Sequence, residues 1–213
     1  MGVMDFIREY VEQTEMRVPI LTSDIYEYVR LRMPNVQKNV LNEYIVRYSK
    51  VNPNFVRHKK GVYYRTEDTP FGKAGIKYPE LIKRAYLQDG NEIIGYETGP
   101  SFMNKIGLTT QMPHYTYLAT ERIKKSYVDK KSGICLIKPV VNITNENYRY
   151  LQFLDMLENR MNVTIENENY REILRNHIIR FDLSFEGLIG YARFYNNQNV
   201  FMKLSELATG VSV

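Results

Sequence analysis

The segment "NPNFVRHKKGVYYR" (residues 52–65) decides how the first third of the chain folds. Phe-Val at 55–56 and Val-Tyr-Tyr at 62–64 are residue types that are enriched in β-strands. The basic run between them, residues 57–61, ends in a glycine, whose permissive backbone suits a tight turn. The segment therefore predicts a two-stranded hairpin with a basic tip.

Three helical patterns precede this hairpin. We expect Thr22 to cap the second helix, and this helix to end before Pro34. The expected buried stripes are Val3, Phe6, Ile7, Tyr10 and Val11; then Ile25, Tyr28, Val29 and Leu31; then Val36, Val40, Tyr44, Ile45 and Tyr48. Three helices and a basic hairpin, with a short Pro/Asn turn before the third helix, are the order of a winged helix-turn-helix.

Charge is distributed unevenly along the chain. The net charge is +5, but residues 17–65 hold ten basic and three acidic residues, a surplus of seven. From residue 141 onward, nine acidic residues face seven basic ones. This asymmetry favours a polyanion-binding module fused to a second part with a different role.

The helix and the hairpin supply the candidate contacts for a nucleic acid. Amide and guanidinium groups match base edges in the major groove, whereas Lys and Arg neutralise phosphates. The alternative is a solvated polar face with no ligand. Double-stranded DNA is favoured over RNA, because the aromatic residues fit core stripes better than stacking platforms. The candidates are Gln37, Lys38, Asn42 and Arg47 on the third helix, and Arg57, His58, Lys59 and Lys60 at the hairpin tip.

We expect an α+β fold in which a winged helix-turn-helix at residues 1–66 precedes a mixed α/β domain with C-terminal helices. Residues 67–78, rich in Gly, Pro, Thr and charge, are the expected linker. The second domain, residues 79–213, begins with a short helix in "PELIKRAYLQ". Strands are expected in "NEIIGYE", "HYTYLAT", "IKKSYV" and "GICLIKPVV", and helical patterns follow from residue 144 onward.

A Gly-Pro-Ser turn at 99–101 raises the question of a phosphate-binding or nucleotidyltransferase loop. No Asp or Glu that could hold magnesium occurs from 99 to 120, and Lys105 is not followed by the Ser or Thr of a P-loop. The structural interpretation explains more: Ser101 caps a short helix and Gly107 ends it. We therefore expect no catalytic residue in this segment.

Other catalytic and metal sites find little support. The three histidines are far apart in the sequence, which argues against zinc, and His177 suits a hydrogen-bonded core position. Cys135 lies in an apolar strand pattern, as a buried, unreactive thiol would. Glu166, Glu168 and Glu172 have the pattern of helix-start and surface residues. We expect no cofactor, no metal and no enzymatic activity.

Cysteine usage and hydropathy indicate the compartment in which the chain is expected. A single cysteine excludes an intrachain disulfide, the N-terminal segment lacks the apolar core of a signal peptide, and no window approaches 18 apolar residues. We expect a cytoplasmic protein without membrane association. The aromatic-rich C-terminal helices suit either a dimer interface or a core, so the sequence leaves the oligomeric state open.

The wing ending in "KKGVYYR", followed by "GYETGPSFMNKIGLTTQMPHYTYLAT", resembles the AbiEi family of type IV antitoxins. The resemblance covers about residues 20–160, and "GLTTQMP" at 107–113 is its most specific part. It implies an autorepressor that binds its own operator DNA and counters a nucleotidyltransferase toxin encoded beside it. Two alternatives stay open: a winged-helix regulator whose second domain senses a ligand or oligomerises, and a metal-dependent nucleic-acid-processing enzyme.

Overall fold

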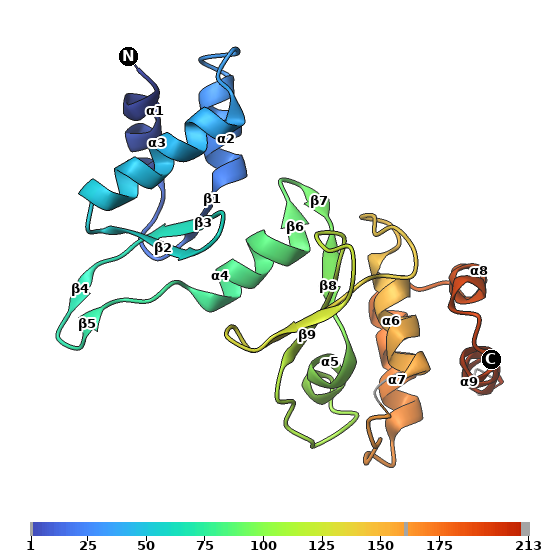
Figure 1. Ribbon diagram of the computed structural model, residues 1–213. Helices are drawn as coiled ribbons and strands as arrows, with labels where there is room; N and C mark the ends of the chain where they lie inside the picture. Colours follow the sequence, from blue (N-terminus) through green and yellow to red (C-terminus); the bar gives the residue numbers. More distant parts are fainter. Residues whose placement is uncertain (1, 160–161, 210–213) are drawn as a thin grey trace. The chain divides into compact units, whose positions relative to one another are not determined.

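The computed structural model describes residues 2–159 and 162–209, and it divides into two compact units, Met1–Ala85 and Tyr86–Val213 (Figure 1). Both units combine helices with small sheets. The chain therefore has the mixed α and β composition that the sequence predicts.

The first unit combines three helices with a three-stranded antiparallel sheet of order β1-β3-β2, whose first strand lies between the first two helices in the sequence. Its core contains Ile7, Ile20, Ile25, Leu41 and Ile45, which are fully buried. The strand β1 was not expected from the sequence, because three residues are too short for an alternating pattern. The elements are α1 (Val3–Gln13), β1 (Pro19–Leu21), α2 (Thr22–Arg30), α3 (Lys38–Val51), β2 (Phe55–Lys59) and β3 (Val62–Arg65).

Three details of the expected helices are wrong. Leu31, expected in the core, is 82% exposed, and Val40 is 39% exposed, because the buried stripe of α3 passes through Leu41 instead. Thr22 is the first residue of α2 rather than its cap; the N-cap position holds Leu21, and no side chain bonds there. The backbone N–H of Thr22 instead donates to the carbonyl of Gly61, 3.0 Å away.

Residues 67–78, expected as a linker, are bonded to the first unit. They form the hairpin β4 (Asp68–Thr69) and β5 (Gly72–Lys73) and lead into α4 (Tyr78–Ile82). The Lys77 N–H donates to the Arg17 carbonyl at 2.7 Å, and the Arg17 guanidinium donates to the Gly75 carbonyl at 2.9 Å. The first unit therefore extends past the expected boundary.

The second unit is built on a four-stranded sheet of order β10-β11-β9-β8, in which β9 and β11 are parallel and the other pairs antiparallel. These strands coincide with segments in which the sequence predicts strands. Two further short strands, β6 (Gln88–Asp89) and β7 (Glu92–Ile93), pair with each other. The sheet contains β8 (Gly95–Glu97), β9 (Thr116–Thr120), β10 (Tyr127–Asp129) and β11 (Ile134–Ile137), with α5 (Gly99–Lys105) between β8 and β9.

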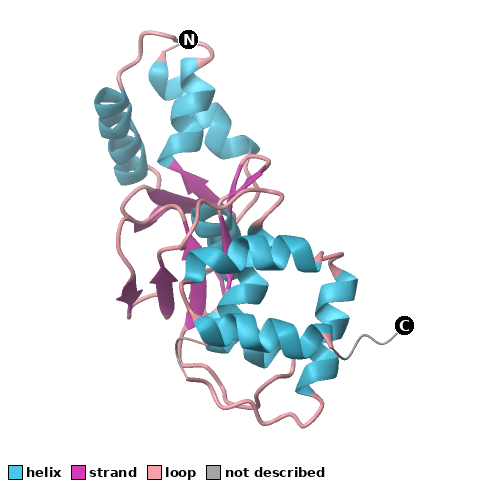
Figure 2. Ribbon diagram, turned by 90° about the vertical axis from the view of Figure 1, so that its right-hand side faces the viewer, coloured by secondary structure: helices cyan, strands magenta, loops and turns pink. Residues whose placement is uncertain are grey.

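Four helices complete the second unit: α6 (Tyr148–Glu158), α7 (Tyr170–Arg180), α8 (Phe185–Ala192) and α9 (Gln198–Ala208). α6 packs against β8 on one side and against α8 and α9 on the other (Figure 1). Figure 2, viewed from the side of α8 and α9, shows these helices as a cyan group in front of the magenta sheet. The large core of this unit, which includes Phe102, Phe153, Leu188 and Leu204, lies among these layers.

Candidate functional site

All four residues chosen on the third helix are exposed in the structure. Gln37 occupies the N-cap position of α3, and Lys38 is its first residue. Asn42 and Arg47 lie farther along the helix, and neither belongs to the buried stripe. The helix therefore offers all four side chains to solvent, with Gln37 and Lys38 at the end whose N–H groups attract anions.

The four residues do not share one line along the helix. Successive residues turn by about 100° around an α-helix, so Asn42 and Arg47, five positions apart, point about 140° away from each other. Asn39 and Glu43, both exposed, occupy the centre of the face between them. Sequence reasoning missed these two because it placed Val40 in the core. The buried stripe that sets this orientation is Leu41, Ile45 and Tyr48.

The hairpin tip has an irregular register that turns its basic side chains apart. Arg57 pairs with Tyr63 and Lys59 pairs with Val62, so His58 is an extra residue in β2, as in a β-bulge. Gly61 has φ of 78°, in the left-handed region that favours glycine. Of the four candidates at the tip, Arg57, His58 and Lys60 are exposed and Lys59 is partly buried.

Three aromatic rings join α3 to the hairpin. The rings of Tyr48 and Phe55 lie with centroids 5.4 Å apart, and those of Phe55 and Tyr63 stack at 5.0 Å. All three side chains are buried. The stack fixes the base of the hairpin against the helix, so the basic tip and the exposed face of α3 belong to one rigid body.

Four cations of this surface, Lys38, Arg47, Arg57 and Lys60, form no salt bridge within the described residues. Lys38 and Arg47 instead lie near aromatic rings, each 5.7 Å from a ring centroid, of Tyr26 and Tyr44 respectively. These cations keep a net positive field toward solvent, which suits a polyanion.

The Gly-Pro-Ser segment forms the start of α5, although Ser101 does not cap it as expected. Ser101 lies inside α5 rather than at its cap; its buried hydroxyl donates to the Thr98 carbonyl and accepts from the Tyr117 N–H. The N-cap residue is Thr98. The prediction for Gly107 is confirmed: it has φ of 83° and ends α5, with the N–H of Leu108 bonded to the Met103 carbonyl.

The following Thr-Thr-Gln turn is anchored by the nearby Asn104 and by two residues that are far away in the sequence, Glu166 and Asn167. The carboxylate of Glu166 accepts hydrogen bonds from the backbone N–H and the hydroxyl of Thr110, and these bonds lower its pKa. Asn104 donates to the carbonyls of Thr109 and Gln111, and Asn167 donates to that of Gly107. Glu166, expected as a surface residue, thus holds this turn in place.

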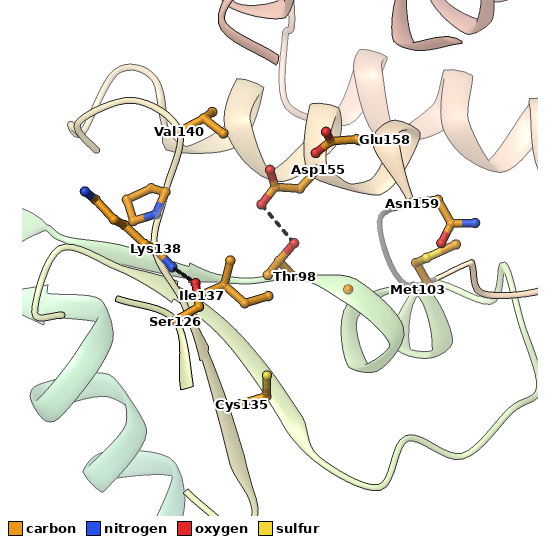
Figure 3. Close-up of a pocket in the computed structure, with 12 residues that line it drawn as sticks. Thr98, Met103, Ser126, Cys135, Ile137, Lys138, Val140, Asp155, Glu158 and Asn159 are labelled. Carbon is orange, nitrogen blue, oxygen red and sulfur yellow. Dashed lines mark hydrogen bonds between the residues drawn. The ribbon is translucent and has the colours of Figure 1, made fainter. Parts of the chain in front are cut away.

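A cavity of about 240 Å³ opens in the second unit beside Asp155 (Figure 3). The Asp155 carboxylate accepts hydrogen bonds from three hydroxyls: those of Tyr96 at 3.0 Å, Thr98 at 3.0 Å and Tyr195 at 2.7 Å. Burial, and then the nearby Asp155 carboxylate, raise the pKa of Tyr195, which therefore stays a donor. These bonds tie α6 to β8 and to the turn after α8, and sequence reasoning missed them.

Two further candidates lie in the second unit. His177 is buried between phenylalanine rings, and its Nε2 atom has no hydrogen-bond partner within the described residues, so the expectation of a hydrogen-bonded histidine is wrong for that atom. Burial lowers its pKa to about 4, so it is neutral at pH 7. Cys135 is partly buried in β11, and burial raises its pKa, which disfavours the thiolate.

Within residues 2–159 and 162–209, no group of three or more His, Cys, Asp or Glu side chains is arranged to hold a metal ion. No helix in these ranges is both long enough and apolar enough to cross a membrane.

The chain was also compared with known proteins. No protein-family model matches it, and no curated protein matches it significantly.

Proposed function

We propose that the first unit is a winged helix-turn-helix that binds double-stranded DNA, and that the protein regulates transcription. The observation that carries the proposal is the exposed basic surface of α3 and the β2–β3 tip, fixed together by the Tyr48–Phe55–Tyr63 stack. The order of elements supports it as well: α2 and α3 are separated by a short turn, and the hairpin follows directly. In this arrangement α3 is the recognition helix and the hairpin is the wing.

The chemistry of the surface suggests how the contacts divide. Asn39 and Asn42 carry amides that can pair with adenine in the major groove, and they lie in the first half of α3, where recognition helices contact bases. Arg57 and Lys60 on the wing, and Arg47 on the flank of the helix, suit phosphates. Glu43 would repel phosphates, so its place on the face favours a base contact, such as the amino group of cytosine.

In its narrower form, the proposal is an autorepressor and antitoxin that counters a nucleotidyltransferase toxin. The support for this part is the sequence resemblance to the AbiEi antitoxins, centred on residues 107–113. The internal bonds that fix this turn agree with a structural signature rather than a catalytic loop. The proposal assigns no catalytic activity to the chain.

The DNA-binding test compares salt dependence between two matched variants. We expect Arg57→Ala with Lys60→Ala to weaken binding to the upstream region of the protein's own gene. If each removes one phosphate contact, the slope of log K against log[salt] falls by about 1.8. The control, Arg180→Ala with Arg193→Ala, removes the same charge from exposed positions of the second unit. Equal slopes in both variants would refute the wing assignment.

Sequence readout and toxin neutralisation need separate measurements. Asn39→Ala should reduce discrimination between operator and random DNA by about 1–3 kcal/mol, whereas an equal loss on both DNAs would argue against base readout.

For the antitoxin role, the chain is co-expressed with a nucleotidyltransferase encoded beside its gene. We expect growth to be restored by the wild-type chain and also by the Arg57/Lys60 variant. Continued growth arrest with the wild-type chain would refute neutralisation of the toxin, and it would leave the DNA-binding proposal standing.

A further inference from the structure

A second cavity of the second unit, about 340 Å³ in volume, is bordered by α6, α7 and α9. Its walls are mostly apolar and include Leu108, Met156, Leu174 and Leu207. All four of these side chains are buried. The volume is near the lower end of the range of about 300–1,000 Å³ that is typical of small-molecule sites.

A lysine lies on the core-facing side of α9, where an apolar residue is expected. Val200, Leu204 and Leu207 are buried at helical spacing, and Lys203 lies on the same side of the helix. Its side chain lines the cavity and is only partly exposed. Burial lowers the pKa of this ammonium group, because the apolar wall solvates the charged form less well than water does.

The ammonium group of Lys203 retains hydrogen-bonding capacity. It donates one bond, 2.6 Å long, to the carbonyl of Leu157 in the last turn of α6. This is its one hydrogen-bond partner within the described residues, whereas an ammonium group has three donors. One of its N–H groups is thus used by the bond to a carbonyl at the C-terminal end of α6. The other N–H groups are available to a molecule in the cavity.

The charges at the rim favour an anion. Arg171 and Glu206 line the same cavity and pair with each other at 3.5 Å, with both side chains more than half exposed. With Lys203, the three groups carry a net charge of one positive unit. A cationic ligand would be repelled by this excess, and a wholly apolar one would leave the lysine donors unpaired.

We propose that this cavity binds a small amphipathic carboxylate, whose carboxylate accepts hydrogen bonds from Lys203 and whose hydrocarbon part lies against Met156, Leu174 and Leu207. A single carboxylate matches the available donors, and the apolar walls match a short chain. The site lies within the second unit, and the inference does not depend on DNA binding by the first.

The test uses the full chain and three probes of equal chain length: octanoate, octylamine and octan-1-ol. By isothermal titration calorimetry at neutral pH, we expect octanoate to bind the wild-type protein at least about tenfold more tightly than either of the others, a difference of about 1.4 kcal/mol. Absence of octanoate binding, or equal affinity for all three probes, would overturn the proposal. This comparison needs no variant.

A substitution then locates the site. Lys203→Met replaces the side chain by an unbranched one that is one atom shorter, which keeps the apolar wall but removes the charge, so octanoate should lose its advantage over octan-1-ol. The matched control is Lys105→Met, a lysine whose side chain is 68% exposed and pairs with Glu97. It should keep the wild-type preference. If Lys203→Met binds octanoate as tightly as the wild type does, the ligand lies elsewhere and the proposal fails.

Discussion

Replacing His177 should make the protein less sensitive to acid. The side chain is 8% exposed and lies against the rings of Phe153 and Phe181. Burial is the main cause of its lowered pKa of about 4, and the positive charges of Arg149 and Arg180 add to it. In the unfolded chain the imidazole is surrounded by water, so its pKa is about 6.5.

The sign and size of the effect follow from these two values. Because the folded state has the lower pKa, protons bind the unfolded state preferentially as the pH falls below about 6.5. The contribution of His177 is therefore fully present above that pH and is lost progressively toward about pH 4. Between pH 7.5 and pH 5 the two pKa values give a loss of about 2 kcal/mol in the free energy of unfolding.

The measurement is urea unfolding, followed by far-UV circular dichroism, at pH 7.5, 6 and 5. We expect the wild type to lose about 2 kcal/mol more than His177→Leu does over this range. His114→Leu, at an exposed histidine, is the matched control and should behave like the wild type. Carboxylates titrate in all three proteins, so their effect cancels in the comparison. Parallel losses in the wild type and His177→Leu would refute the reasoning.

Two further predictions concern the framework of the second unit. In Gly95→Ala, the new Cβ would lie 2.2 Å from the Tyr86 carbonyl oxygen and 2.7 Å from the Ala119 carbonyl oxygen, so the backbone must move. We expect a loss of about 3 kcal/mol in the free energy of unfolding, the upper part of the range for overpacking, and an unchanged melting temperature would contradict this. Asp155→Ala removes the acceptor of the Tyr96 and Thr98 hydroxyls, whereas the Tyr195 hydroxyl can still donate to the Leu151 carbonyl at 3.0 Å. We expect this variant to cost about 2–5 kcal/mol by urea unfolding, against about 1 kcal/mol for Tyr195→Phe; equal losses would contradict the conclusion that Asp155 joins these elements.

Helices and strands of this chain were largely predictable from local sequence. The expected C-terminal helical patterns coincide with α6 to α9, and the four strands of the larger sheet overlap the expected strand segments. Such patterns are visible because each element buries one face, and the period of the apolar residues reports the type of element. The register between elements leaves no such local trace.

The orientation of α3 shows where periodicity becomes ambiguous. The expected stripe passes through Val40 and the observed one through Leu41, a difference of one residue and about 100° of rotation. Both residues are apolar and lie four positions before another apolar residue, Tyr44 and Ile45 respectively. Packing against the other helices of the first unit decides between them, and this decision exposes Asn39, which the sequence did not single out.

Contacts between distant residues were not predictable from the sequence either. Glu166 reaches Thr110 across 56 positions, and Asp155 reaches Tyr96 across 59. A carboxylate in a helix or loop has the same local pattern whether it faces solvent or a distant hydroxyl. The absence of acids near the Gly-Pro-Ser turn therefore described only the local segment, while the fold brings the carboxylate of Asp155 to Thr98, directly before that turn.

The two units differ in whether their polar groups are bonded inside the chain, and this difference bears on where ligands bind. In the second unit, the polar groups around the conspicuous turn and around Asp155 are occupied by bonds that hold elements together. On α3 and the β2–β3 hairpin, Lys38, Arg47, Arg57 and Lys60 form no salt bridge within the described residues, and they lie on a body already fixed by buried aromatic rings. Because Arg57 and Lys60 form no salt bridge within the described residues, they can be replaced with little cost to folding. Loss of DNA binding in the Arg57/Lys60 variant, with an unchanged free energy of unfolding, would therefore identify a binding surface rather than a structural one.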